Sequence, residues 1–451
     1  MGMLQLFYRF CLIMTCGFFA AMPLSAHAFG LIRDAETEAT LRAYATPIFE
    51  KAGLTPSSVR IFIVNSPEIN AFVAGGANLF IHTGLILATD EPSMLLGVIA
   101  HETGHIEGGH LIQGMEKLKN AQLGTILSTV LGAAIMVGGG KDVGQAVIAG
   151  GQEVAKRDFL AFSRSNENAA DQAGLRYLDA LGISANGMLR LFEKLRQNEH
   201  RRFGKPDPYV LTHPLSTDRI THIRNHVLQS TIPKNKLPTN FQARYDRMIA
   251  KLRGFMQDPS LTFTQYPEKD ASLAARYARS IAYFKKADLT TALKLIDGLI
   301  AEKPNDAYFH ELRGQFLFEN GKVKEAAASY QRAAQLQPGS ALILANYGQT
   351  LLAQDTPETI AQSIRPLEKA VGIDPSLTMA WEQLVIAYGK QNNPGRSFLA
   401  RAEVAALQGN PSEIKRNVLQ AQKSLPKQGP ARLRSEDLQR LAEEMDEDKK
   451  R

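Results

Sequence analysis

Proline recurs at a spacing of 34 residues in the second half of the chain, and this period constrains the fold more than any other feature of the sequence. The period separates Pro304 from Pro338. Between them, small, large and turn-forming residues stand where two helices and a tight turn need them, at Gly314, Gly321, Ala326, Tyr330 and Ala333. A 34-residue period is typical of helical hairpins that stack, because each hairpin can bury its apolar face only against its neighbours.

Neighbouring units extend this pattern in both directions. The units 273–304 and 341–375 follow it, and a fourth unit begins near Thr378 and then loses it. The period and the positions are those of the tetratricopeptide repeat, so we expect an all-α tetratricopeptide solenoid over residues 272–425, with an unrelated helical bundle as the alternative. The highly charged residues 426–451 are expected to form a solvated helix or tail.

The first 28 residues have the parts of a secretory signal peptide. Arg9 is the only charge ahead of an apolar run over residues 10–22, and an A-x-A cleavage site ends at Ala28. A membrane span needs about 20 residues, so the short run favours cleavage over an uncleaved anchor. Both cysteines, Cys11 and Cys16, lie inside this segment. We therefore expect an exported protein whose mature form has no disulfide and no thiolate metal site.

The distribution of charge and apolar residues bears on whether the chain binds nucleic acid or membranes. The net charge of +7 is spread along the chain without a block of like charges, which gives no indication of a nucleic-acid partner. A peripheral contact with an anionic membrane surface is compatible with it. Residues 121–140 carry no charge, and they predict an apolar helical hairpin over residues 121–151. Its many glycines favour a hairpin that is buried or touches a membrane over one that spans it.

The region before the repeats mixes strand and helix patterns. Residues 59–64 are β-branched and aromatic, and residues 70–81 read as two strands joined through Gly75 and Gly76. Helical patterns are expected over residues 36–53, 91–119, 166–181, 185–198 and 216–229. We expect an α+β domain over residues 29–255 and a linker over residues 256–271.

One helix of this domain carries the sequence His101-Glu102-Thr103-Gly104-His105. On a helix, residues i and i+4 share a face, so both imidazoles can point at one metal ion. Glu102 can then reach a water molecule beside that ion. A helix with two incidental histidines is the alternative, and the buried, mid-helix context disfavours it.

A catalytic zinc ion needs a third protein ligand and an open position. The segment 163–171, SRSNENAAD, supplies Glu167 at an expected helix start, with Asp171 one turn later. Asp171 can accept the free ring N–H of His101 and so fix its tautomer. An exposed acidic face is the alternative for such a pair in isolation.

The pattern H-E-x-x-H followed by S-R-x-x-E-x-x-A-D resembles the gluzincin peptidases of the HtpX and CAAX-prenyl-protease type. The strand NAFVAGG at residues 70–76 and the sequence THP around His213, followed by Arg219, also match, and the resemblance covers about residues 30–230. It implies a zincin-type (gluzincin) α+β fold and a zinc endopeptidase. One Zn²⁺ per chain would be held by His101, His105 and Glu167, with Glu102 as the catalytic base.

The signal peptide and the repeats make the chain similar to periplasmic members of this family that act in outer-membrane protein assembly. That similarity implies a periplasmic location, with outer-membrane association as a further option. The implied substrates are unfolded or stalled outer-membrane β-barrel proteins, reached with their assembly machinery through the solenoid. The alternative is mainly a latent-protease chaperone or scaffold.

Several further residues are candidates with open roles. A substrate strand could pair with Asn70, Ala71, Phe72, Val73 and Ala74. His213 is a possible fourth ligand that holds the site closed, and it is also a candidate for stabilising the oxyanion, as are Arg219, Arg164 and Tyr209. His110 is expected to lie off the metal face in a structural role, and His82 is expected to be exposed.

Overall fold

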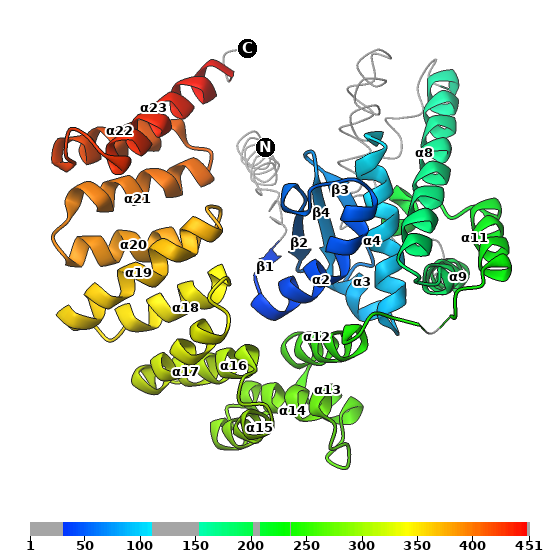
Figure 1. Ribbon diagram of the computed structural model, residues 1–451, viewed down its shortest axis with the longest axis horizontal. Coiled ribbons are helices and arrows are strands. Elements are labelled where there is room, and N and C mark those ends of the chain that lie inside the picture. The colour runs from blue at the N-terminus through cyan, green and yellow to red at the C-terminus, as the bar shows by residue number, and fades with distance from the viewer. Residues whose placement is uncertain (1–29, 111–152, 202–207, 235, 449–451) are drawn as a thin grey trace, which may run out of the picture.

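A computed structural model describes residues 30–110, 153–201, 208–234 and 236–448. The predicted signal peptide and the predicted apolar hairpin at 121–151 lie outside these ranges. A mixed α/β part is followed by a long stack of helices, and the two lie side by side (Figure 1). Among the helices that the structure describes, none combines the length and the apolarity that crossing a membrane requires.

A four-stranded sheet lies in the first part, in the order β1-β2-β4-β3. The strands are β1 (Leu31–Ile32), β2 (Arg60–Val64), β3 (Ala71–Ala74) and β4 (Asn78–His82). β2 and β4 run parallel, whereas the pairs β1–β2 and β3–β4 are antiparallel. Gly75 and Gly76 form the predicted β3–β4 turn with φ values of 57° and 91°, which glycine adopts without strain. β3 therefore lies at one edge of the sheet.

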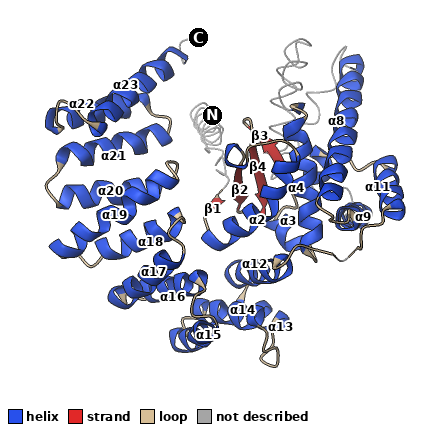
Figure 2. Ribbon diagram, in the orientation of Figure 1, coloured by secondary structure: helices blue, strands red, loops and turns tan. Residues whose placement is uncertain are grey.

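Helices pack against this sheet and against one another (Figure 2). They are α2 (Ala35–Lys51), α3 (Thr83–Ala88), α4 (Pro92–Glu107), α8 (Glu153–Ala180), α9 (Asn186–Arg201), α10 (Pro208–Thr212), α11 (Thr217–Gln229) and α12 (Phe241–Met256), with a short 3₁₀ turn at Pro56–Ser58. α4 packs against α2, α8 and α9, and every residue from Pro92 to Gly104 is buried. The helix with the H-E-x-x-H sequence is thus the central element of the core.

Two predicted helix boundaries are wrong. The helix expected over residues 91–119 ends at Glu107, because Gly108 and Gly109 follow and Gly109 turns the chain with a φ of +59°. The helix expected from residue 166 begins at Glu153, since no glycine or proline interrupts the preceding residues. Glu167 consequently lies in the interior of a helix and not at its start.

The helices after residue 272 form the predicted tetratricopeptide solenoid. Its hairpins are α14 (Leu273–Lys285) with α15 (Leu289–Glu302), α16 (Ala307–Glu319) with α17 (Val323–Leu336), α18 (Ala341–Leu352) with α19 (Pro357–Ile373), and α20 (Thr378–Lys390) with α21 (Pro394–Leu407). The pattern positions Ala292, Ala333 and Ala370 are fully buried between helices. The fourth unit loses the sequence pattern but keeps the helical hairpin.

The segments on either side of the solenoid contain further helices. The expected linker 256–271 contains the helix α13 (Pro259–Gln265), and α12 packs directly on α14. At the other end, α22 (Pro411–Ser424) is followed by α23 (Pro430–Asp448), whose Leu438 and Ala442 are fully buried. The charged C-terminal segment is therefore a helix, one of the two expected forms; most of its residues are exposed, and a few buried ones pack it on the last hairpin.

Candidate metal centre

Helices α4 and α8 approach each other so closely beside the H-E-x-x-H sequence that their backbones are in contact. A Cβ atom on Gly104 would lie 2.8 Å from the carbonyl oxygen of Ala170, and one on Gly174 would lie 3.2 Å from the carbonyl carbon of Ala100. Side chains larger than hydrogen would therefore push the helices apart. This close approach places Glu167 of α8 opposite His101 and His105 of α4.

Four side chains from three elements converge on one point. Nε2 of His105 lies 3.2 Å from Nε2 of His101, and Nδ1 of His213 lies 3.3 Å from the same atom. The carboxylate of Glu167 lies 3.3 Å from each of the two Nε2 atoms and 3.1 Å from Nδ1 of His213. One ligand atom from each residue falls within 4.8 Å of all the others.

The donor set fits a metal ion. Nδ1 of His101 lies 2.9 Å from Oδ1 of Asp171, so its ring proton belongs on that side and the lone pair of Nε2 faces the cluster. Imidazole nitrogens that face one another at about van der Waals distance repel unless a proton or a cation lies between them. Nitrogen and carboxylate ligands in this number are those of a zinc-type site.

Burial and charge set the protonation of the cluster. Burial opposes ionisation of Glu167, but the neighbouring His213 and the hydrogen bonds from the histidines hold its pKa well below the usual range. Burial also opposes the charged form of His101, yet Asp171 and Glu167 raise its pKa to about 9. Burial lowers the pKa of His105 to about 3. At neutral pH Glu167 is an anion at the centre of the cluster.

Glu102 lies beside the cluster without a hydrogen bond among the described residues. It is fully buried, and neither carboxylate oxygen has a hydrogen-bond partner among the described residues. Burial raises the pKa of Glu102. Its Oε1 atom lies 3.3 Å from Nε2 of His213. A buried carboxylate without hydrogen bonds is costly, and its position next to the donor set is that of a group that exchanges a proton.

Arg219, a candidate for oxyanion stabilisation, is held by two carboxylates. Its guanidinium lies 2.6 Å and 2.9 Å from the two oxygens of Asp171, and its Nη1 atom lies 2.9 Å from Glu167. These contacts orient both acidic side chains, so the guanidinium is engaged in holding Glu167 and Asp171 in place. Arg164, another candidate, is exposed.

Tyr209, also a candidate for oxyanion stabilisation, lies beside His213 in the site. It belongs to the five-residue helix α10, and its ring lies 4.7 Å from the ring of His213. The side chain is fully buried, and its hydroxyl has no hydrogen-bond partner within the described part of the chain. Among the oxyanion candidates, Nε2 of His213 also lacks a hydrogen-bond partner in the described part of the chain, so both groups could still donate.

The structure also shows the positions of the remaining predicted residues. His213 follows α10 and is buried with the other donors. The candidate substrate strand, residues 70–74, consists of β3 and the residue before it, and the edge position of β3 leaves one side without a strand partner among the described residues. His82 is 1% exposed at the end of β4, so its expected exposure is wrong. His110 contacts the far side of His105, which the sequence spacing did not reveal.

Two parts of the sequence match the models of known protein families. Residues 33–227 match Peptidase family M48, and residues 277–341 match the tetratricopeptide repeat. The chain carries an M48 peptidase domain. All residues of the cluster lie inside the matched range, and the match supports a metalloendopeptidase.

Full-length relatives share both parts of the chain. The beta-barrel assembly-enhancing protease of Yersinia pestis is 26% identical over 405 residues, which cover 88% of this chain and 81% of the relative. The protein of the same name from Escherichia coli (strain K12) is 26% identical and covers 84% and 77%. Among solved structures, MamA matches 38% of this chain and 95% of its own, with 16% identity and a TM-score of 0.29.

Proposed function

We propose that this protein is a zinc-dependent endopeptidase that is exported to the bacterial periplasm. It acts on unfolded or stalled outer-membrane β-barrel proteins during their assembly and degrades those that are misassembled. The observation that carries the proposal is the convergence of His101, His105 and Glu167 beside a buried Glu102 without hydrogen bonds. The names of the relatives, which refer to β-barrel assembly, support the substrate class.

The chemistry follows from the positions of the side chains. His101, His105 and Glu167 would hold one Zn²⁺ per chain, which polarises a scissile carbonyl and acidifies a water molecule when it is bound. Glu102 takes the proton of the attacking water and delivers it to the leaving amine. Asp171 keeps the ring of His101 in the ligating tautomer. The hydroxyl of Tyr209 is available to donate to the developing oxyanion.

The edge strand β3 supports binding of an extended substrate. The N–H of His82 donates to the carbonyl of Asn70, so the alternation of an antiparallel pair turns the backbone groups of Ala71 and Val73 away from β4. A substrate strand could pair with these groups. Stalled β-barrel proteins expose unpaired strands, which is the form that such an edge accepts.

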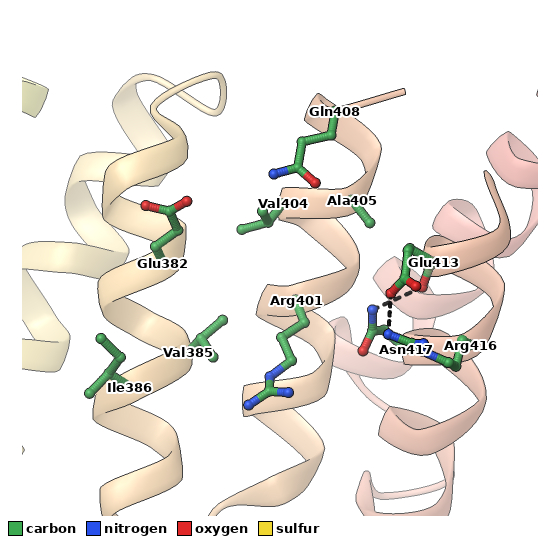
Figure 3. A pocket seen from close by; sticks show the side chains of 10 residues that line it. All are labelled: Glu382, Val385, Ile386, Arg401, Val404, Ala405, Gln408, Glu413, Arg416 and Asn417. Atoms are coloured by element: carbon green, nitrogen blue, oxygen red, sulfur yellow. Dashed lines mark hydrogen bonds and ion pairs between the residues drawn. The ribbon is translucent and has the colours of Figure 1, made fainter. Parts of the chain in front are cut away.

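The solenoid supports a role for protein partners. An open pocket of about 490 Å³ lies where α20, α21 and α22 meet (Figure 3). Val385, Ile386 and Val404 give it an apolar wall, and Glu382 and Arg401 add charge. We propose that this surface engages the outer-membrane assembly machinery, and that the protein is peripherally associated with that membrane.

A second candidate function is a chaperone or scaffold whose peptidase site is mostly latent. His213 favours it, because its Nδ1 atom already lies among the donors that would surround the ion. A fourth protein ligand would fill the position that a catalytic zinc keeps open for water. Both functions are compatible if the loop that carries His213 moves.

Zinc content and casein cleavage test the proposal on mature wild-type protein and on Glu102→Gln. We expect about one zinc per chain in both proteins and cleavage by the wild type alone, with a loss of about 10²-fold or more in the variant. Wild-type turnover by Glu102→Gln would remove Glu102 from the mechanism. Full zinc occupancy in His105→Ala would contradict the ligand assignment.

A further inference from the structure

His110 folds back onto the histidine that precedes it by five residues. α4 ends at Glu107, and Gly109 reverses the chain with a φ of +59°. The ring of His110 then lies with its Nδ1 atom 3.0 Å from Nδ1 of His105, and the two ring planes meet at 81°. This contact is on the side of His105 that faces away from the donor cluster, whose members lie near Nε2.

The turn leaves a space that the His110 ring fills. A Cβ atom on Gly108 would lie 2.3 Å from Nε2 of His110. The backbone of Gly108 is in the right-handed helical region, which any residue can adopt. A side chain at residue 108 would therefore displace the imidazole of His110 from this position, whereas the backbone conformation would tolerate it. Two glycines in succession allow the ring of His110 to reach His105.

The tautomers follow from the geometry. If His105 binds the metal through Nε2, its proton is on Nδ1, and the hydrogen bond to His110 must run from His105 to His110. Nδ1 of His110 is then the acceptor, and His110 carries its own proton on Nε2. The equivalent acceptor for His101 is the carboxylate of Asp171. The two histidine ligands are thus oriented by different groups, one neutral and one anionic.

We propose that His110 is a positioning residue that fixes the tautomer and the ring orientation of the metal ligand His105. The inference rests on the metal site proposed above. Loss of such a partner typically weakens metal affinity by about 10- to 100-fold. The side chain acts through His105 and does not itself reach the donor cluster.

The test measures the zinc affinity of full-length protein by competition with a chromophoric chelator. We expect His110→Ala to bind zinc about 10- to 100-fold more weakly than wild type. His110→Asn places an amide oxygen close to the position of Nδ1 and should recover most of the affinity. His110→Gln places the oxygen near the position of Nε2 and should not. The exposed His222 provides a matched control, because His222→Ala removes an imidazole from α11 without touching the site.

A second readout separates positioning from general damage to the fold. Cobalt-substituted protein reports ligand geometry through its visible absorption bands, which should shift in His110→Ala and return in His110→Asn. Equal affinities for the Asn and Gln variants, or wild-type affinity in His110→Ala, would overturn the inference. If His110→Ala does not fold, the zinc affinities of His110→Asn and His110→Gln still test the role of His110. Wild-type protein that binds no zinc would instead refute the proposed metal site.

Discussion

The phenol of Tyr277 donates a hydrogen bond to Oε2 of Glu36, 2.8 Å away, and so joins the first helix of the solenoid to α2 of the peptidase domain. Arg247 and Lys251 of α12 surround the same carboxylate. Lys251 also lies 2.5 Å from Asp34, and all of these side chains are largely buried. A charge cluster withdrawn from water therefore connects the peptidase domain to the repeats.

Replacement of Lys251 tests how strongly this cluster holds the two domains. Lys251 lies between Asp34, Glu36 and Glu311, with Glu311 at 3.3 Å. In Lys251→Met the buried carboxylates lose their cation, so we expect the free energy of unfolding to fall by about 3–5 kcal/mol. Denaturant unfolding of the full-length protein measures the loss.

Lys324→Met is the matched control, because Lys324 is exposed on α17. It should change the free energy of unfolding by less than about 0.5 kcal/mol. Equal unfolding midpoints for the two variants would show that the cluster contributes little to the join between the domains.

The contacts between the two domains could not be predicted from the sequence, whereas the solenoid and the paired histidines could. The 34-residue period predicted the solenoid because each repeat contacts only its neighbours, so local pattern and fold coincide. The H-E-x-x-H spacing placed two donors on one helix face for the same local reason. The contact of Glu36 with Tyr277 joins residues 241 apart, and no local periodicity encodes it. His82 was misjudged because it ends a strand that lies between β2 and β3, and this strand order is not encoded in the local pattern.

Replacement of His213 by alanine distinguishes its two proposed roles, as a latch on the metal site and as a group that stabilises the oxyanion. If its ring fills the open position of the metal, His213→Ala should raise basal casein cleavage or cause self-cleavage while His101, His105 and Glu167 still hold zinc. If the ring instead stabilises the oxyanion, the same change should lower turnover by about 10²-fold. The assay is made at matched zinc occupancy with His222→Ala as control. Reduced turnover would contradict the latch, and unchanged turnover would leave His213 a structural role.

A single proline substitution tests whether the free edge of β3 pairs with the substrate backbone. Val73 directs its N–H away from β4, so Val73→Pro should leave the ladder of the sheet intact and remove one donor from the free edge. We expect kcat/KM for an unfolded substrate to fall, with zinc content unchanged. Val73→Ala keeps the N–H and should retain activity. Equal losses in both variants would show that the side chain matters and the backbone pairing does not.

Burial of His82 predicts a dependence of stability on pH. Burial lowers the pKa of His82 from 6.5 to about 4, although a carboxylate oxygen of Glu68 lies 4.0 Å from its ring. The folded state therefore favours the neutral ring. The stability that depends on this preference is present above pH 6.5 and is lost as pH falls toward 4, by up to about 3 kcal/mol.

Unfolding of metal-free protein between pH 7 and pH 4 measures this effect. The free energy of unfolding should fall less steeply in His82→Gln than in wild type, because glutamine does not titrate. His222→Gln, at an exposed position, should follow the wild-type curve. Parallel curves for wild type and His82→Gln would contradict a depressed pKa in the folded state.

The backbone contact between Gly104 and Ala170 bears on attempts to transplant this centre. In a pattern search the two residues between Glu102 and His105 count as free choices, since neither supplies a ligand. Here one of them is the point at which two helices touch, and it sets the span between the histidines and Glu167. A designer who grafts the five-residue sequence onto another helix must also carry over the small-residue face of α8, or the third donor will stand too far away.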